Sequence, residues 1–525
     1  MRQERKKRAM KRPRPIGEMQ RQPAADHISG HFENDFQALQ DLLANNSDLR
    51  TGMIRTEDGK RVALFFYAGL IDQQLLNHNV VGPIQRNRAP LTAEVLLQRI
   101  IKAPNGAVEK SLAALGTDLA KGAVIILMEG LDEAITVTMP QFPGRGIERS
   151  QSEDVLIGPH QSFCEDLNKN LNLLRRYLKI PQLKIKNLEL GRISKTDLAI
   201  VYIEGVAQEK LVREVEERLG RIDIDFVLGA SYLIEFLEEQ PFSILPQLKL
   251  TERPDRVVAA LSEGRVAILA GGDPVCLVVP FFVPEAMQSA EDYYEKPLIA
   301  TFLRWLRLFS AALSIFLPGT WITLVSFHHG IIPPTLFNSI VTGRENVPFP
   351  TIIEAFLLLI AFDIVIEAST RLPSAVGQAV GIVGAIILGQ SAVQASLISP
   401  TMIIVVALAG LAVYTLPSPS SVSAIRVLKY LVLAVSSVLG LFGTIWAFIL
   451  ITIKATSMRS FGYPSMFPVA PLNVRGWTDI FLKLPNTLIK QRPHFLAAEN
   501  ERRLNEGVTP YPGKDEPREN QNPDS

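Results

Sequence analysis

The residues whose types and spacing best indicate a function lie in the stretch 376–396, which reads VGQAVGIVGAIILGQSAVQAS. On a helix, one stripe of this stretch is apolar over about three turns and polar toward one end. This candidate pore-lining stripe consists of Val376, Val380, Val383, Ile387, Ser391 and Gln394. The neighbouring stripe of small residues, suited to close helix packing, consists of Gly377, Gly381 and Gly384. Identical helices around an axis would form a hydrophobic gate with a polar mouth, whereas an ordinary helix pair would show the same glycines. Both interpretations stay open.

A second group of polar residues lies in the apolar stretch 352–368 and just after it. Asp363 and Glu367 are four residues apart, and Arg371 follows Glu367 by the same step, so all three share one helical face. An unpaired carboxylate in hydrocarbon costs several kcal/mol, so we expect these groups to face protein or water. The spacing predicts an intramembrane ion pair, and an ion-binding site remains the alternative.

The rest of the chain offers little for catalysis. The segment GRISKT at 191–196 lacks the glycines of a phosphate-binding loop. The histidines at 31, 78 and 160 have no metal-ligand spacing, and Cys164 and Cys276 lie far apart. We therefore expect no enzyme, no metal site and no cofactor.

The distribution of charge divides the chain into regions. The 525 residues are 47% apolar with a net charge of +1, which excludes a disordered chain and gives no reason to expect nucleic acid. Residues 301–458 contain only 11 charged residues in 158, as expected of a segment that meets lipid. Its apolar stretches are 308–327, 352–368, 375–397, 402–416 and 431–453.

Basic residues flank this region on both sides, which places both chain ends in the cytoplasm and requires an even number of spans. We therefore expect about four spans, with 352–368 as an interfacial or re-entrant helix because it carries three carboxylates. Five spans, with the C-terminus outside, are the alternative.

The N-terminal region alternates β-branched runs with helical periodicity, which predicts an α/β (α+β) fold. The expected strands are 61–66, 123–128, 134–138, 198–203, 266–269 and 275–279, and the expected helices are 91–115, 163–178, 209–219, 232–238 and 254–261. A Pro/Gly-rich break at 140–146 suggests two subdomains. The predicted organisation is a basic disordered head (1–29), soluble subdomains (30–145 and 146–295), an all-α polytopic membrane domain (296–458) and a cytoplasmic tail (459–525), disordered after about 490.

Several blocks of the sequence carry a family resemblance. They include EDYYEKPLIATFLR (291–304), LPGTWITLVSFHHGIIP (317–333), RLPSAVGQAVGIVGAIILGQSAVQAS (371–396) and MRSFGYPSMFPVAPL (458–472). In these blocks the chain resembles the GerA-type spore germination proteins, specifically the A subunit of nutrient germinant receptors. The stage V sporulation protein AF is similar too.

The resemblance implies a multi-pass protein of the spore inner membrane whose N-terminal region faces the cytoplasm, the spore core. It implies a permease-like B subunit and a lipoprotein C subunit as partners, besides membrane lipids. It also implies a homo-oligomer, such as a pentamer, that acts as a nutrient-gated ion channel to start germination. The alternative is a membrane-anchored scaffold or signalling subunit of the receptor without its own pore.

Overall fold

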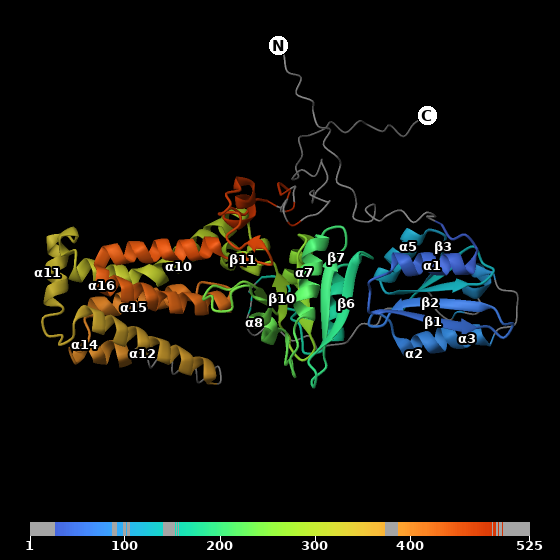
Figure 1. The fold of residues 1–525 in the computed structure, drawn as a ribbon, viewed down its shortest axis with the longest axis horizontal. Coiled ribbons are helices and arrows are strands. Elements are labelled where there is room, and N and C mark those ends of the chain that lie inside the picture. The colour runs from blue at the N-terminus through green and yellow to red at the C-terminus, as the bar shows by residue number, and fades with distance from the viewer. Residues whose placement is uncertain are drawn as a thin grey trace, which may run out of the picture.

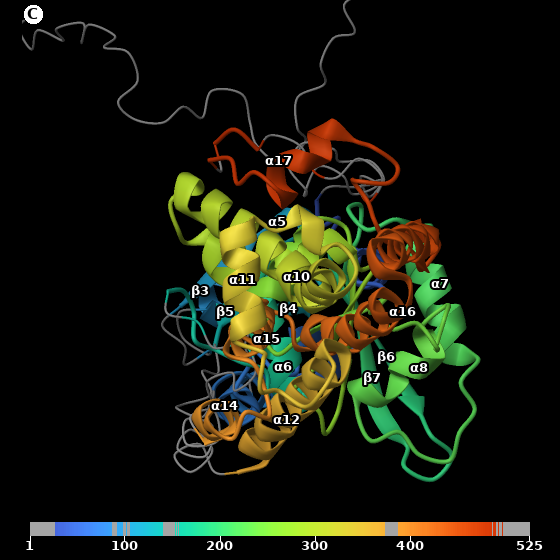
Figure 2. The same cartoon turned by 90° about the vertical axis from the view of Figure 1, so that its left-hand side faces the viewer.

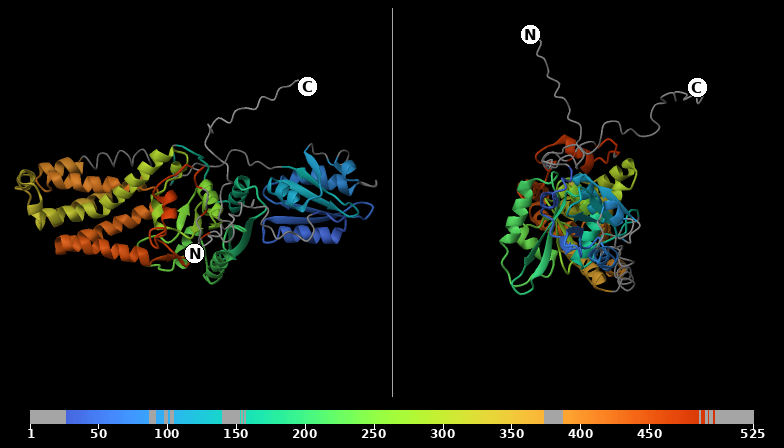
Figure 3. Two further views of the ribbon diagram at one scale, coloured as in Figure 1. Left: turned by 90° about the horizontal axis from the view of Figure 1, so that it is seen from above. Right: turned by 90° about the vertical axis from the view of Figure 1, so that its right-hand side faces the viewer.

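The computed structural model describes residues 27–86, 92–97, 101, 105–139, 153, 155, 157–372, 387–485, 487–489, 492 and 496. The molecule is elongated, with two β-sheets one after the other and a bundle of helices at one end (Figure 1). The first sheet, in blue, lies farthest from the helices, and the second sheet, in green, lies between. The view from above shows the same order, and in the view along the long axis the two sheets and the helices lie one behind the other (Figure 3).

The first unit is a five-stranded antiparallel sheet in the order β1-β2-β4-β5-β3. Its strands are β1 (Leu49–Arg55), β2 (Arg61–Tyr67), β3 (Gly106–Glu109), β4 (Ala123–Met128) and β5 (Ala134–Thr138). Its helical segments are α1 (Phe32–Leu42), α2 (Gln73–Leu76), η2 (Asn77–Val81), α3 (Gly82–Gln85), α4 (Ala93–Val95) and α5 (Leu112–Ala120). Every residue of β4 is buried, which explains its unbroken apolar sequence.

The second unit is also a five-stranded antiparallel sheet, in the order β6-β7-β9-β10-β8. Its strands are β6 (Leu183–Leu190), β7 (Thr196–Ile203), β8 (Lys249–Thr251), β9 (Val266–Ala270) and β10 (Cys276–Val279). Its helices are α6 (Leu167–Tyr177), α7 (Glu209–Gly220), α8 (Ile234–Leu237) and α9 (Pro254–Ser262). Alternate residues of β7 and β9 enter two different cores, so both faces of this sheet are covered.

The two units share one topology, because strand order 1-2-4-5-3 describes both sheets. The shared plan extends to the turns. In each unit a glycine with positive φ ends a helix, and a second such glycine follows eight residues later, after a buried strand. These glycines are Gly122 (φ 93°) and Gly130 (φ 88°) in the first unit, and Gly264 (φ 99°) and Gly272 (φ 82°) in the second. L-amino acids with a side chain rarely adopt this conformation, so the turns depend on glycine.

Most of the predicted elements are confirmed. All six expected strands are present, as β2, β4, β5, β7, β9 and β10, and the expected helices 163–178, 209–219 and 254–261 correspond to α6, α7 and α9. Expected helix 232–238 is split into a 3₁₀ turn, η4 (Ala230–Leu233), and α8.

The prediction of one helix over 91–115 is wrong, because this range contains α4, strand β3 and the start of α5. Gly106 begins β3, where its backbone pairs with Val137 of β5. Strand pairing with a distant segment therefore overrode the local helical periodicity.

The helical region begins with α10 (Pro297–Ser326), followed by α11 (Pro334–Thr342), α12 (Thr351–Arg371), η8 (Ile387–Ser391), α14 (Ala392–Gln394), α15 (Pro400–Val413) and α16 (Pro419–Ser457). Figure 2 shows the long helices from the end of the bundle. Ile322 of α10 clusters with Met402 of α15, and Ala311 clusters with Val413. These pairs show that α10 and α15 run in opposite directions.

Helix α16 folds back on itself at Gly440, which has φ 59° and ψ −140°. The hydroxyl oxygens of Ser436 and Thr444 lie 2.8 Å apart. Eight residues of a continuous helix would span about 12 Å, so this contact requires two antiparallel arms. The prediction of a single continuous span over 431–453 is therefore wrong. Glycine permits the reversal because a positive φ is strained for other residues.

Two described helical segments, Pro297–Ser326 and Pro419–Ser457, are long and apolar enough to cross a bilayer, and Pro400–Val413 is a shorter apolar helix. The second long segment is the one that doubles back at Gly440. Helix α12 has 21 residues and is continuous through its three carboxylates.

Candidate functional site

Half of the predicted pore-lining stripe lies outside the described residues. Val376, Val380 and Val383 fall there, as do all three packing glycines, Gly377, Gly381 and Gly384. Ile387 begins the π-helical turn η8, which Ser391 ends. Ser391 and Gln394 are exposed. The amide of Leu397 donates to the carbonyl of Ala392 at 2.9 Å, so the chain turns between this polar end of the stripe and α15.

Of the three residues predicted to interact, the structure pairs Glu367 with Arg371 but places Asp363 beside another helix. The Arg371 guanidinium lies 2.6 Å from Glu367, and both side chains are exposed. Asp363 instead contacts the neighbouring helix α16, where Lys429 Nζ lies 3.2 Å away and the Tyr430 hydroxyl donates at 2.5 Å. Lys429 is 3% exposed, so this cation depends on Asp363 for compensation. The sequence signal for the pair was a lysine within an apolar run.

The third carboxylate of α12, Glu354, is fully buried. It accepts hydrogen bonds from the backbone amide and the hydroxyl of Ser399, the N-cap residue of α15. Arg344 lies 3.7 Å away and supplies the compensating charge. A carboxylate at a helix N-terminus also interacts favourably with the helix dipole. Glu354 therefore joins the starts of α12 and α15.

A buried charge cluster joins the second unit to the helical region. The carboxylate of Asp292, in the 3₁₀ turn η6 (Ala290–Tyr293), is fully buried and lies 3.1 Å from Arg304 and 2.8 Å from Arg307 of α10. Arg304 also donates to the carbonyl of Asp479, in the short helix α17 (Trp477–Ile480). The sequence analysis did not predict this cluster.

The chain after α16 returns to the second unit. Phe461 lies between the short strands β11 (Arg459–Ser460) and β12 (Tyr463–Pro464) and packs into a core of the second unit. The Ser460 hydroxyl accepts from the amide of Phe281 at 3.0 Å, and the amide of Gly462 donates to Glu239 at 2.7 Å. Both ends of the helical region are thus fixed to the second unit, at α10 and after α16.

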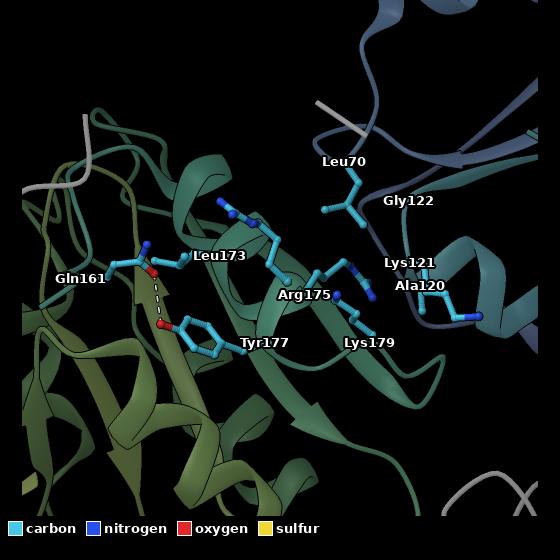
Figure 4. Close-up of a pocket in the computed structure, with 10 residues that line it drawn as sticks. Leu70, Ala120, Lys121, Gly122, Gln161, Leu173, Arg175, Tyr177 and Lys179 are labelled. Atoms are coloured by element: carbon cyan, nitrogen blue, oxygen red, sulfur yellow. Dashed lines mark hydrogen bonds between the residues drawn. The ribbon is translucent and has the colours of Figure 1, made fainter. Parts of the chain in front are cut away.

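The two units meet at a buried arginine. Arg175 of α6 is 1% exposed, forms an ion pair with Asp48 and lies with its guanidinium 3.7 Å from the ring centre of Tyr67. Beside it lies a cavity of about 380 Å³ (Figure 4). Its lining residues are Leu70, Ala120, Lys121, Gly122, Gln161, Leu173, Arg175, Arg176, Tyr177 and Lys179. Of the cations that line this cavity, Arg175 is paired with Asp48 and Lys121 with Asp118.

Within the described part of the chain, no cluster of three or more His, Cys, Asp or Glu residues is placed to hold a metal ion. Burial raises the pKa of the Cys276 thiol, which disfavours the thiolate that a nucleophile would need. The described polar clusters therefore join helices and units to one another.

Comparisons with known proteins match most of the chain. A family model described as the Bacillus/Clostridium GerA spore germination protein matches residues 37–495. Spore germination protein KA of Bacillus subtilis (strain 168) is 34% identical over 490 residues, which cover 92% of this chain and 90% of that protein. Spore germination protein GerLA of Bacillus cereus is 32% identical over 477 residues, which cover 90% of this chain and 97% of that protein.

A solved structure also matches the N-terminal region. It is the N-terminal domain of the A subunit of the Bacillus megaterium spore germinant receptor GerK3, with 24% identity and a TM-score of 0.39 over 48% of this chain and 95% of that chain. The family model and the two full-length relatives carry the assignment. The chain belongs to the GerA family of spore germination proteins.

Proposed function

We propose that this chain is the A subunit of a nutrient germinant receptor and forms, with further copies of itself, a gated ion channel in the spore inner membrane. Family membership supports the germination role. A permease-like B subunit and a lipoprotein C subunit are the partners of this proposal. Nutrient recognition by a partner would shift the assembly from a closed to an open state, because a ligand shifts an equilibrium by its differential affinity for the two states.

The observation that carries the membrane part of the proposal is the distribution of polarity in the helical region. Glu354 and Lys429 are buried and lie beside charges of opposite sign. The outer faces of the helices expose large apolar side chains, including Phe309 (61%), Ile404 (67%) and Leu450 (55%). Apolar groups outside and paired charges inside are what a bilayer requires.

The fold-back of α16 changes the number of spans that we propose. Helix α10, helix α12, helix α15 and the two arms of α16 give five passages. Arg371 and Ala392 lie at opposite ends of the bundle, because α12 and α15 run in the same direction from the contact between Glu354 and Ser399. The stretch 375–397 between them is the sixth passage of the proposal. Six spans keep both chain ends on the cytoplasmic side, as the flanking basic residues require.

The stripe from Val376 to Gln394 remains the proposed pore lining. Ser391 and Gln394 are exposed at the end of the bundle away from the β-sheets, where they would form the polar mouth. Val376, Val380, Val383 and Ile387 would form the hydrophobic constriction, which blocks ions when it is narrow enough to exclude water.

Replacement of a constriction residue tests the pore. Val383→Ala widens the proposed constriction, so spores that carry it should release ions and germinate without nutrient. Val427→Ala, on the exposed face of α16 (50% exposed), is the matched control and should behave like the parent chain. The measurements are ion release and loss of refractility, with protein levels checked by immunoblot. Nutrient-dependent germination of Val383→Ala spores at normal protein levels would contradict the pore assignment and favour the scaffold.

A further inference from the structure

An exposed aromatic cluster surrounds the first turns of α10. The ring centres of Trp305 and Phe481 lie 6.1 Å apart, and those of Trp477 and Phe481 lie 5.4 Å apart. Trp305 is 51% exposed and Trp477 is 36% exposed. The segment that carries Trp477 and Phe481 is fixed to α10, because the Lys483 amide donates to Thr301 at 3.0 Å. A segment distant in sequence thus adds aromatic rings to the start of the helix.

A further exposed aromatic side chain, from a loop of the second unit, lies near the end of α16. Phe242, in the loop before β8, is fully exposed. The residues beside it are bound to the end of α16, because Lys454 donates to Gln240 at 2.6 Å and the Ser243 hydroxyl contacts the Met458 sulfur at 3.4 Å. The fold therefore holds an apolar ring in the open at the base of a helix.

These aromatic residues lie at a similar height along the bundle. The rings of Phe316 and Phe448 are in contact, with centres 5.8 Å apart, and they provide a common reference for α10 and α16. With a rise of 1.5 Å per residue, Trp305 lies about 17 Å from this contact toward the β-sheets, and Met458 lies about 15 Å from it in the same direction. Both distances correspond to about half of a 30 Å hydrocarbon core.

On α16, cations replace apolar side chains toward this height. Ile453 is 57% exposed and is followed by exposed Lys454 and, after the helix, by exposed Arg459. Tryptophan rings, which are apolar but carry one polar N–H, are typical of the lipid headgroup layer, where cations border them and phenylalanine rings can enter the adjoining hydrocarbon.

We propose that Phe242, Trp305, Trp477 and Phe481 form an interfacial belt that binds the headgroup layer of an anionic phospholipid membrane on the side of the β-sheets. This inference rests on the proposed membrane location of the helices. Lys454 and Arg459 face lipid phosphates, while the rings lie at the edge of the hydrocarbon. Because Phe242 belongs to the second unit and Trp477 to the tail, the belt fixes the height and tilt of the second unit above the bilayer.

Spin-label accessibility tests the belt in the full-length chain. The chain carries Cys164→Ser and is reconstituted into vesicles of phosphatidylglycerol and phosphatidylethanolamine. Cys276 is fully buried and does not react, which labelling of this parent checks. A nitroxide is attached to Phe242→Cys or, in a second protein, to Phe481→Cys. Leu450→Cys on α16 marks the hydrocarbon, and Ile193→Cys, 77% exposed in the turn between β6 and β7, marks water.

The readout is the ratio of collisions with oxygen, which concentrates in lipid, to collisions with a water-soluble nickel complex. We expect the ratio at residues 242 and 481 to exceed that at residue 193 several-fold and to fall below that at residue 450. A ratio at both belt positions equal to that at residue 193 would overturn the belt while residue 450 still reports lipid. Low collision rates with both reagents would show that protein covers the belt, which also overturns it. A water-like ratio at residue 450 would instead contradict the proposed membrane location itself.

Discussion

The two α/β units have the same strand order and the same glycine turns, yet they differ in what they are connected to. The first unit contacts the second through Arg175, Asp48 and Tyr67. The second unit is bound to α10 through Asp292 and to the chain after α16 through Phe461. One architecture therefore serves as an outer module in one copy and as the base of the helical region in the other. The two units differ because the second is followed by the turn that carries buried Asp292 and receives Phe461 from the chain after α16.

The largest loss of stability should follow from a substitution in the buried cluster of Asp292, Arg304 and Arg307, which has no counterpart in the first unit. Asp292→Asn removes the carboxylate from between Arg304 and Arg307, which leaves Arg304 with only the more distant carboxylate of Asp479, at 3.9 Å, and takes from buried Arg307 the carboxylate that it contacts. Breaking a buried ion pair costs about 3–5 kcal/mol, so the thermal unfolding temperature of the solubilised chain should fall by several degrees. Asp132→Asn in the first unit is the control, because its side chain is 72% exposed and its ion pair is screened by water. Equal effects of the two substitutions would remove the contrast between the units.

A smaller effect concerns the pH dependence of stability, to which Lys249 of β8 should contribute and Lys110, which follows β3, should not. Burial lowers the pKa of Lys249 from 10.5 to about 8, although Glu285 opposes the shift. Between pH 8 and pH 10 the unfolded chain holds this proton and the folded chain has lost it. Stability therefore rises with pH in this window, by about 2 kcal/mol. Denaturant titrations should show that Lys249→Met abolishes this rise and that Lys110→Met retains it. A rise that persists in Lys249→Met would assign it to other groups.

The smallest effects should be equal in the two units. Gly130→Ala and Gly272→Ala each place a side chain on a residue with positive φ, at a cost of about 1–2 kcal/mol. A Cβ at either position would have its nearest neighbour at an ordinary contact distance, 3.9 Å for Gly130 and 3.8 Å for Gly272. Matched losses of stability would show that the common topology depends on the same backbone turns. A loss of stability at only one of the two positions would show that the units share their strand order but not their dependence on these turns.

The elements predicted most accurately are those whose signal is local. Strands such as 123–128 are continuous apolar runs between turn residues, and all six expected strands are present. Strand β6 was not predicted, because its sequence LKIKNLEL carries charges on both faces and its apolar residues change face within the strand. The helix expected over 91–115 was wrong because β3 gains its hydrogen bonds from β5, which is distant in sequence.

The candidate site shows the same limit. The spacing of Glu367 and Arg371 was sufficient to place them beside each other, because residues four apart share a helix face. Asp363 has the same spacing to Glu367, but its partner Lys429 lies 66 residues further along the chain. No local pattern specifies which helix packs beside α12. The stripe from Val376 to Ile387 remains a prediction, since its side chains lie outside the described residues.

By itself, the sequence determined the class of the N-terminal region, the position of six of its ten described strands, the start of the apolar region and the family. Only the tertiary structure decided that the two units repeat one topology, that α16 doubles back at Gly440 and that Asp292 joins the second unit to α10. The physical reason is the distance along the chain over which each interaction acts. Hydrophobic periodicity and turn residues act over a few positions, whereas the partner of a buried charge and the direction of a helix depend on which distant segments pack together.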